Sequence, residues 1–90
     1  MEAQISGEVY KLYDQQVISQ KFSKREVVIK TSDGQYYPIQ FTNKNIPKLD
    51  RTRIGDNVLV SCNITGREWI DKSNKEKFFL AIDGQSISVI

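Results

Sequence analysis

Apolar and polar residues alternate along most of the chain, with the period of two that is typical of half-buried β-strands. Shorter polar runs, several containing glycine, asparagine or aspartate, separate the alternating segments. The pattern therefore predicts five short strands, over residues 4–13, 25–31, 36–42, 58–69 and 77–83.

Within each predicted strand, the alternation divides inward-facing from outward-facing side chains. In the first strand, Ile5, Gly7 and Val9 fall on one face and Tyr10 and Leu12 on the other. Gly7 lies inside that strand and indicates a bulge or bend of the kind that curls a sheet into a barrel. Phe78 and Phe79 are adjacent, so one must face inward, and the spacing favours Phe78. The predicted inward-facing residues of the other strands are Val27, Ile29, Tyr37, Ile39, Phe41, Val58, Val60, Cys62, Ile64, Phe78, Leu80 and Ile82.

The segments between the strands carry recognisable turn and helix signals. Residues 14–24 are polar and are expected to form a long loop, and Asp33-Gly34 predicts a hairpin turn. Two apolar residues three positions apart predict one or two helical turns within residues 43–52. Pro47 is compatible with that helix only in its first turn. Residues 86–90 are expected to form a short tail.

Five short strands, a glycine bend in the first and a small helix between the third and fourth describe an OB-fold, a five-stranded Greek-key barrel. An SH3-like barrel is the alternative, but it usually lacks a helical element at this position. The chain has 90 residues, which is enough for one domain over residues 1–90 and not for two.

Composition argues against a membrane-spanning, disulfide-bonded or exported protein. No apolar run approaches the roughly 20 residues needed to cross a bilayer. Cys62 is the only cysteine, so no internal disulfide can form, which fits a reducing compartment. The first residues lack the basic and apolar stretches of an export signal. A small cytoplasmic domain is expected.

The charge distribution is more informative than the net charge of +2. Residues 21–53 contain eight Lys or Arg and three Asp or Glu, a local net charge of +5. Such a chain can present a basic face while remaining nearly neutral. A normally solvated surface explains the same run of charges.

The residues needed for catalysis are scarce. There is no histidine, so histidine-dependent triads and metal sites are excluded. The aspartates fall mostly at predicted turns, and the five glycines stand singly instead of forming a phosphate-binding loop. We expect a binding protein with no catalytic residues, metal or cofactor, and not an enzyme.

Aromatic and basic residues interleave in a way that suits single-stranded nucleic acid, because unpaired bases stack on aromatic rings and cations neutralise phosphates. Alternation places Trp69 and Tyr36 on outer faces, and Phe79 is a third candidate platform. The candidate residues lie in or near the two segments that grip oligonucleotides in OB-folds, residues 14–24 and 70–77, and in the adjacent strands. The candidate set is Phe22, Lys24, Arg25, Lys30, Tyr36, Arg67, Trp69, Lys72, Lys75, Lys77 and Phe79.

Several of these residues have a purely structural alternative. Trp69 can cover a barrel end as packing, and Tyr36 can be a cross-strand packing partner. Phe22 can anchor its loop to the core. Cys62 alternates with core valines and is expected to be structural.

Two longer motifs resemble bacterial single-stranded DNA-binding proteins. Residues 53–60 read R-I-G-D-N-V-L-V, and residues 65–73 read T-G-R-E-W-I-D-K-S. Residues 27–32 and 43–46 are similar to other parts of that family. The chain also resembles small uncharacterised OB-fold domains of bacteria and phages, through F-S-K-R-E-V-V-I-K-T at residues 22–31.

This resemblance implies stacking roles for Trp69 and Tyr36, and a homo-oligomer, dimer or tetramer, formed through the first strand or through strand edges. Two positions depart from the family pattern. Thr42 stands where an aromatic residue is frequent, and no acidic tail follows Ile90.

Two functions remain open. The first is sequence-tolerant binding of single-stranded DNA in replication, recombination or repair, in a bacterium or phage, with RNA as a variant that stacking and charge do not distinguish. The second is a protein-interaction or assembly module that kept the barrel and lost strong nucleic-acid binding.

Overall fold

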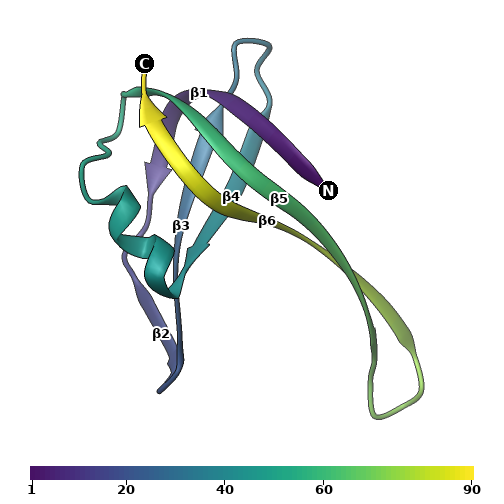
Figure 1. Cartoon of the computed structure of the whole chain (residues 1–90). Coiled ribbons are helices and arrows are strands. Elements are labelled where there is room, and N and C mark those ends of the chain that lie inside the picture. The colour runs from purple at the N-terminus through teal and green to yellow at the C-terminus, as the bar shows by residue number, and fades with distance from the viewer.

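Six strands and one 3₁₀ helix make up the chain (Figure 1). The computed structural model describes residues 1–90. No helix is long and apolar enough to span a membrane. The elements are β1 (Glu2–Leu12), β2 (Gln16–Ser19), β3 (Phe22–Lys30), β4 (Tyr36–Thr42), helix η1 (Asn43–Leu49), β5 (Asn57–Ile70) and β6 (Glu76–Val89).

Strand β1 closes the sheet into a barrel. The strand order is β1-β5-β6-β4-β3-β2, and β1 pairs in addition with β3. All pairings are antiparallel except the short β4–β6 contact, where Gln40 lies opposite Asp83. The ring of five strands, with η1 between β4 and β5, is the OB-fold, so the fold predicted from alternation is confirmed.

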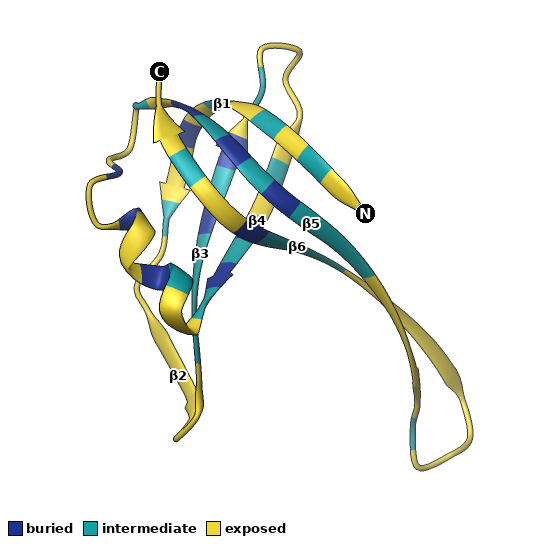
Figure 2. Cartoon of the chain, viewed as in Figure 1, coloured by how far each residue is buried: buried dark blue, intermediate teal, exposed yellow.

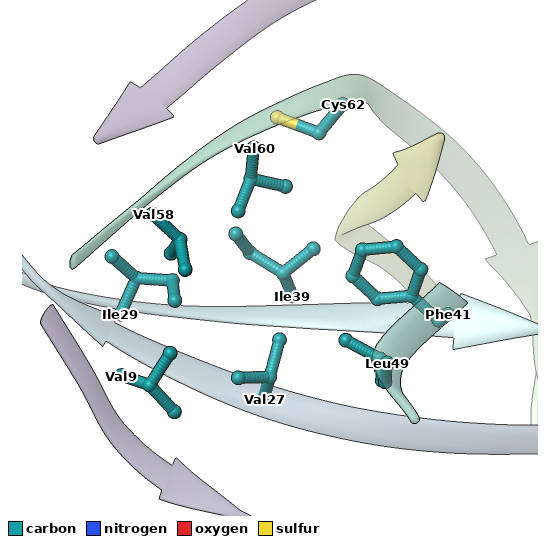
Figure 3. Packing of buried hydrophobic residues seen from close by; sticks show 9 residues of the cluster. All are labelled: Val9, Val27, Ile29, Ile39, Phe41, Leu49, Val58, Val60 and Cys62. Atoms are coloured by element: carbon teal, nitrogen blue, oxygen red, sulfur yellow. The ribbon is translucent and has the colours of Figure 1, made fainter. Parts of the chain in front are cut away.

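The buried apolar residues lie on the strands of the ring and on η1 (Figure 2). The barrel interior is filled by aliphatic side chains together with Phe41 and Cys62 (Figure 3). Leu49 of η1 lies beside Phe41 and covers one end of the barrel (Figure 3). Burying each such side chain contributes roughly 1.5–3 kcal/mol of apolar transfer free energy. The fully buried core consists of Val9, Val27, Ile29, Ile39, Phe41, Leu49, Val58, Val60 and Cys62.

The segment over residues 14–24 is a hairpin, not the expected loop. Strand β2 pairs with the start of β3, with Gln16 opposite Lys24 and Ser19 opposite Phe22. All four residues of β2 are exposed. A strand that buries neither face leaves no alternation in the sequence, so only the backbone pairing reveals it.

The expected tail over residues 86–90 is also strand, because β6 continues to Val89 alongside β5. The register shifts near Gln85: Ser61 lies opposite Ser86, whereas Cys62 lies opposite Gly84. The glycine is required there because a Cβ on Gly84 would lie 2.4 Å from the Phe41 ring. Gly84 therefore lies next to a bulge inside β6 and not at the end of the strand.

The outer parts of β5 and β6 extend beyond the barrel as a two-stranded hairpin (Figure 1). We call residues 66–80 the hairpin arm. Phe78 and Leu80, expected in the core, are 71% and 76% exposed because no third element covers the arm. Ile82, at its base, packs against the core as predicted.

The first strand bends at Tyr10 and not at Gly7. The β1–β3 register shifts between Val9 and Lys11, which makes Tyr10 the extra residue of a bulge. The bulge puts Leu12 on the core side together with Val9, although simple alternation places these two residues on opposite faces. Gly7 has a different role, because β1 passes close to the backbone of Lys30 there.

Pro47 lies in the second half of η1, not in its first turn. A proline removes only its own N–H from the i→i+3 ladder, and the Pro47 carbonyl still accepts a hydrogen bond from the Asp50 N–H at 3.1 Å. The short 3₁₀ helix therefore tolerates the proline at this position.

Substitution of Gly7 tests the closure of the barrel. A Cβ at this position would lie 2.3 Å from the Lys30 carbonyl oxygen, so β1 and β3 must separate. We expect Gly7→Ala to lower the free energy of unfolding by about 1–3 kcal/mol, measured by denaturant titration. Gly66→Ala is the control, because its nearest atom is 4.0 Å away. Equal stability of the two variants would contradict the close approach.

Candidate nucleic-acid interface

One face of the hairpin arm carries two aromatic rings between two cations. Across the arm, Arg67 lies opposite Phe79 and Trp69 lies opposite Lys77. The Trp69 and Phe79 rings meet edge to face, with centroids 6.3 Å apart. The Lys77 Nζ lies 5.8 Å from the Trp69 ring centre. Trp69 and Phe79 are 51% and 55% exposed, so each keeps about half its surface for a ligand.

The face forms a shallow hollow lined by Arg67, Glu68, Trp69 and Phe79. Trp69 therefore points outward, as predicted, and it lies along the extended arm instead of covering an end of the barrel. The hollow is open, and Glu68 borders it from between Arg67 and Trp69, although its side chain belongs to the opposite face of the arm.

The opposite face of the arm is apolar and carries no cation. Ile70, Phe78 and Leu80 are all more than half exposed there, beside Glu68 and Glu76. This arrangement settles which phenylalanine shares a face with Trp69: it is Phe79. Phe78 points to the other side of the same strand.

A tight turn over residues 71–75 ends the arm, shorter than the expected loop over residues 70–77. The Asp71 carboxylate accepts hydrogen bonds from the backbone N–H groups of Ser73 (2.9 Å) and Lys75 (3.0 Å) and from the Ser73 hydroxyl (2.9 Å). The Lys75 bond, and then the Ser73 side chain, hold the pKa of Asp71 below its usual range. The turn presents Lys72 and Lys75 to solvent, whereas Lys77 belongs to β6.

A second group of candidate residues lies on the barrel wall. Tyr36 begins β4, opposite Lys30 of β3, and is 49% exposed, as predicted. The Lys30 Nζ lies 5.6 Å from the Tyr36 ring centre. Tyr10 meets Tyr36 edge to face, with centroids 5.0 Å apart, and the Lys11 Nζ lies 5.5 Å from the Tyr10 ring centre.

Tyr10 and Lys11 were absent from the candidate set. Simple alternation places Lys11 on the inner face, and only the bulge brings both side chains to the outside. The available signal was Tyr10 itself, an aromatic residue on the outer face of the first strand.

The third group lies at the β2–β3 hairpin. Phe22 is 37% exposed at the start of β3. Lys24 lines a hollow with Tyr13, Asp14, Gln16 and Glu26. The Arg25 Nε donates a hydrogen bond to the Tyr13 carbonyl at 2.8 Å, which ties this side chain to the backbone. The hairpin and the arm protrude from different sides of the barrel (Figure 1), so the candidate residues form three separate groups.

Neither the cysteine nor the acidic residues form a reactive cluster. Cys62 is fully buried, and burial raises the pKa of its thiol. Its Sγ lies 3.5 Å from the Ala3 carbonyl oxygen, as expected of a structural residue. No group of three or more Cys, Asp or Glu side chains is arranged to hold a metal ion.

Fold and site together define an OB-fold protein with an aromatic, cationic hairpin arm. The chain belongs to the family described as a domain of unknown function, DUF3127, whose model matches residues 4–88. No curated protein sequence matches the chain.

Among solved structures, the fold is similar to Rim1, the mitochondrial single-stranded DNA-binding protein of S. cerevisiae. One crystal form superposes with a TM-score of 0.69 at 15% identity, covering 100% of this chain and 95% of that one. A second form gives a TM-score of 0.67 at 15% identity, covering 99% and 91%. The likeness shows that this chain and Rim1 share the same fold.

Protonation of Asp71 tests the structure of the arm's tip. Because its hydrogen bonds favour the carboxylate, the turn is held above the lowered pKa and loosens as pH falls through it. We expect the Asp71 carboxyl to titrate below the usual aspartate range in a carbon-detected NMR titration. Ser73→Ala removes one donor and should raise this pKa. An unchanged Asp71 titration in that variant would contradict the hydrogen-bonded turn.

Proposed function

We propose that this protein binds single-stranded DNA without strong sequence preference. The observation that carries the proposal is the face of the hairpin arm on which Trp69 and Phe79 stand half exposed between Arg67 and Lys77. Both rings offer surface to a base, and both cations lie within reach of the phosphates on either side of it.

Stacking on the two rings and phosphate contacts with the cations both contribute binding free energy. Each base stacked on an aromatic side chain contributes about 1–3 kcal/mol, whatever its identity. Neutralising phosphates releases counterions, so the affinity should fall as salt rises. Lys72 and Lys75 at the exposed tip add to the positive potential around the two rings.

The OB-fold shared with a mitochondrial single-stranded DNA-binding protein supports the same function. So does the resemblance of residues 65–73 to the corresponding hairpin of bacterial relatives. We place the protein in DNA replication, recombination or repair in a bacterium or phage. RNA binding would use the same contacts and is separated by comparing oligo(dT) with oligo(U).

The second candidate function, a protein-interaction module, is favoured by the other face of the arm. Ile70, Phe78 and Leu80 form an exposed apolar strip on a hairpin that nothing else supports. Two-stranded hairpins are marginally stable in water, so covering this strip would stabilise the arm. Under this alternative, Phe78→Ala, which truncates the strip, would disrupt a protein complex, and Trp69→Ala would leave DNA retention unchanged.

We also propose that the protein forms a homo-oligomer, dimer or tetramer, through the free edge of β1. Val9 exchanges backbone hydrogen bonds with Asp56 and Gly55 on the β5 side, both at 2.9 Å. Because a ladder alternates, Gln4 and Ser6 direct their backbone groups to the other side. β1 has no partner on that side before Glu8, and an unpaired edge can pair with the same edge of a second copy.

Loss of either ring on the arm tests DNA binding. We expect Trp69→Ala and Phe79→Ala each to weaken binding of labelled oligo(dT) by about 5- to 150-fold, the equivalent of one lost stacking contact. Fluorescence anisotropy at low salt measures the affinity. In the wild-type protein, oligo(dT) should also quench the fluorescence of Trp69, the single tryptophan.

Phe78→Ala is the matched control, because Phe78 is equally large, even more exposed and on the opposite face of the same arm. Its affinity should equal that of the wild type. If the wild type shows neither quenching nor binding at micromolar protein and low salt, the proposed function is ruled out. If Phe78→Ala and Phe79→Ala lose the same amount of affinity, the face with Trp69 and Phe79 is not the binding site.

Proline on the free edge tests the oligomer. Ser6→Pro removes an N–H that faces outward, so it should leave the β1–β5 ladder intact while blocking pairing with a second copy. We expect sedimentation velocity to show an oligomer for the wild type and for Ser6→Ala, and a folded monomer for Ser6→Pro. An oligomeric Ser6→Pro would exclude this edge as the interface.

A further inference from the structure

Tyr10 and Tyr36 come from different strands and meet on the outer wall of the barrel, away from the hairpin arm. Their ring centroids lie 5.0 Å apart at an interplanar angle of 70°. Tyr36 stands at the start of β4, while Tyr10 is the extra residue of the bulge in β1. The arrangement therefore depends on a backbone irregularity at one defined position.

The bulge has a direct effect on what the wall presents. In a regular strand, Tyr10 and Lys11 would point to opposite faces. With the bulge, Lys11 lies opposite Val28 and both Tyr10 and Lys11 are exposed. Bulges frequently re-aim a side chain beside a functional site, and here the result is an aromatic residue and a cation side by side.

The two rings are not sealed by packing. Tyr10 keeps 44% of its surface exposed and Tyr36 keeps 49%. Each ring also has an ammonium group near it, Lys11 at 5.5 Å and Lys30 at 5.6 Å from the respective ring centres. Glu8 lies opposite Lys30, so the cluster has two cations and one acidic residue beside it.

We infer that Tyr10, Tyr36, Lys11 and Lys30 form a second base-stacking platform on the barrel wall, and that Tyr10 is a nucleic-acid-binding residue. This inference rests on the proposed function and extends it. The ligand is a further stretch of the same single-stranded DNA, with bases stacked on the tyrosine pair and phosphates beside the two lysines.

The edge-to-face geometry suits that role. In such a pair, one ring presents its edge to the face of the other, which leaves ring surface open to solvent. A base can stack on this open surface without separating the tyrosines. The lysines already lie close to the rings, so they can shift to phosphates on either side of the stacked base with little loss of contact.

The platform would engage a longer strand than the arm alone. OB-folds bind between about 4 and 16 nucleotides per domain, depending on how much of the barrel the strand follows. A strand held by Trp69 and Phe79 on the arm could continue onto the barrel wall and add contacts there. Binding along the barrel wall would explain why Tyr10 is exposed, whereas binding to the arm alone would not.

Anisotropy titrations of a labelled twenty-nucleotide oligo(dT) test the inference. We expect Tyr10→Ala and Tyr36→Ala each to weaken binding by roughly 5- to 150-fold, and Tyr10→Phe, which keeps the ring, to bind like the wild type. Lys11→Gln should reduce the slope of log affinity against log salt by about 0.7, as expected for one lost phosphate contact on a single strand. The double variant Tyr10→Ala/Tyr36→Ala should lose less than the sum of the single losses, because the rings act as one unit.

Circular dichroism checks that each variant remains folded, and Lys11→Gln provides a test that does not alter the tyrosine pair. If the wild type binds, Tyr10→Ala binds equally tightly and Lys11→Gln shows the same salt slope as the wild type, this inference is overturned and the proposed function stands. Absence of binding by the wild type, together with no Trp69 quenching, would overturn both. A loss in Tyr10→Ala that Tyr10→Phe restores, while Phe78→Ala binds normally, would establish the platform.

Discussion

Strand β1 pairs with β5 through its first half and with β3 through its second half, and the rest of the molecule depends on this double pairing. The strand must bend to serve both neighbours. Gly7 allows the close approach to the Lys30 backbone, and the bulge at Tyr10 absorbs the change of register. Closure then lets nine side chains form a fully buried core in a chain of only 90 residues.

A closed small barrel leaves part of the chain outside it. β5 and β6 are each 14 residues long, and only the inner portion of each lines the barrel. The remainder forms an arm whose two faces follow from the pleat of the strands: Trp69 and Phe79 with cations on one face, Phe78 and Leu80 on the other. The same alternation that fills the core therefore separates two kinds of surface once the strands leave it.

The positions of the charges say more about the proposed binding surface than the net charge does. The chain carries only +2 overall, yet Lys77, Lys30 and Lys11 each lie within 6 Å of an aromatic ring centre. Pairing of ring and cation is what a stacked base with its phosphate requires. Arg25, which is basic and within the predicted set, donates a hydrogen bond from its Nε to the Tyr13 carbonyl.

The sequence by itself determined the elements whose side chains alternate between core and solvent. Residues 36–42 were predicted with the bounds of β4, and every core residue of β3, β4 and β5 stood at a position that the pattern had marked as inward. Tyr36 and Trp69 were correctly placed on outer faces for the same reason. Burial of one face leaves a period of two in the sequence, and that period can be read.

Tertiary structure alone decided the features that leave no such period. β2 buries neither face, Gln85 and Tyr10 lie at bulges that break the alternation, and Phe78 follows the apolar pattern beyond the point where the barrel ends. Which residues meet across strands was equally hidden, so Tyr10 was not linked to Tyr36. Alternation records which side of a strand a residue occupies, but the neighbour on that side is fixed only by register, bulges and barrel closure.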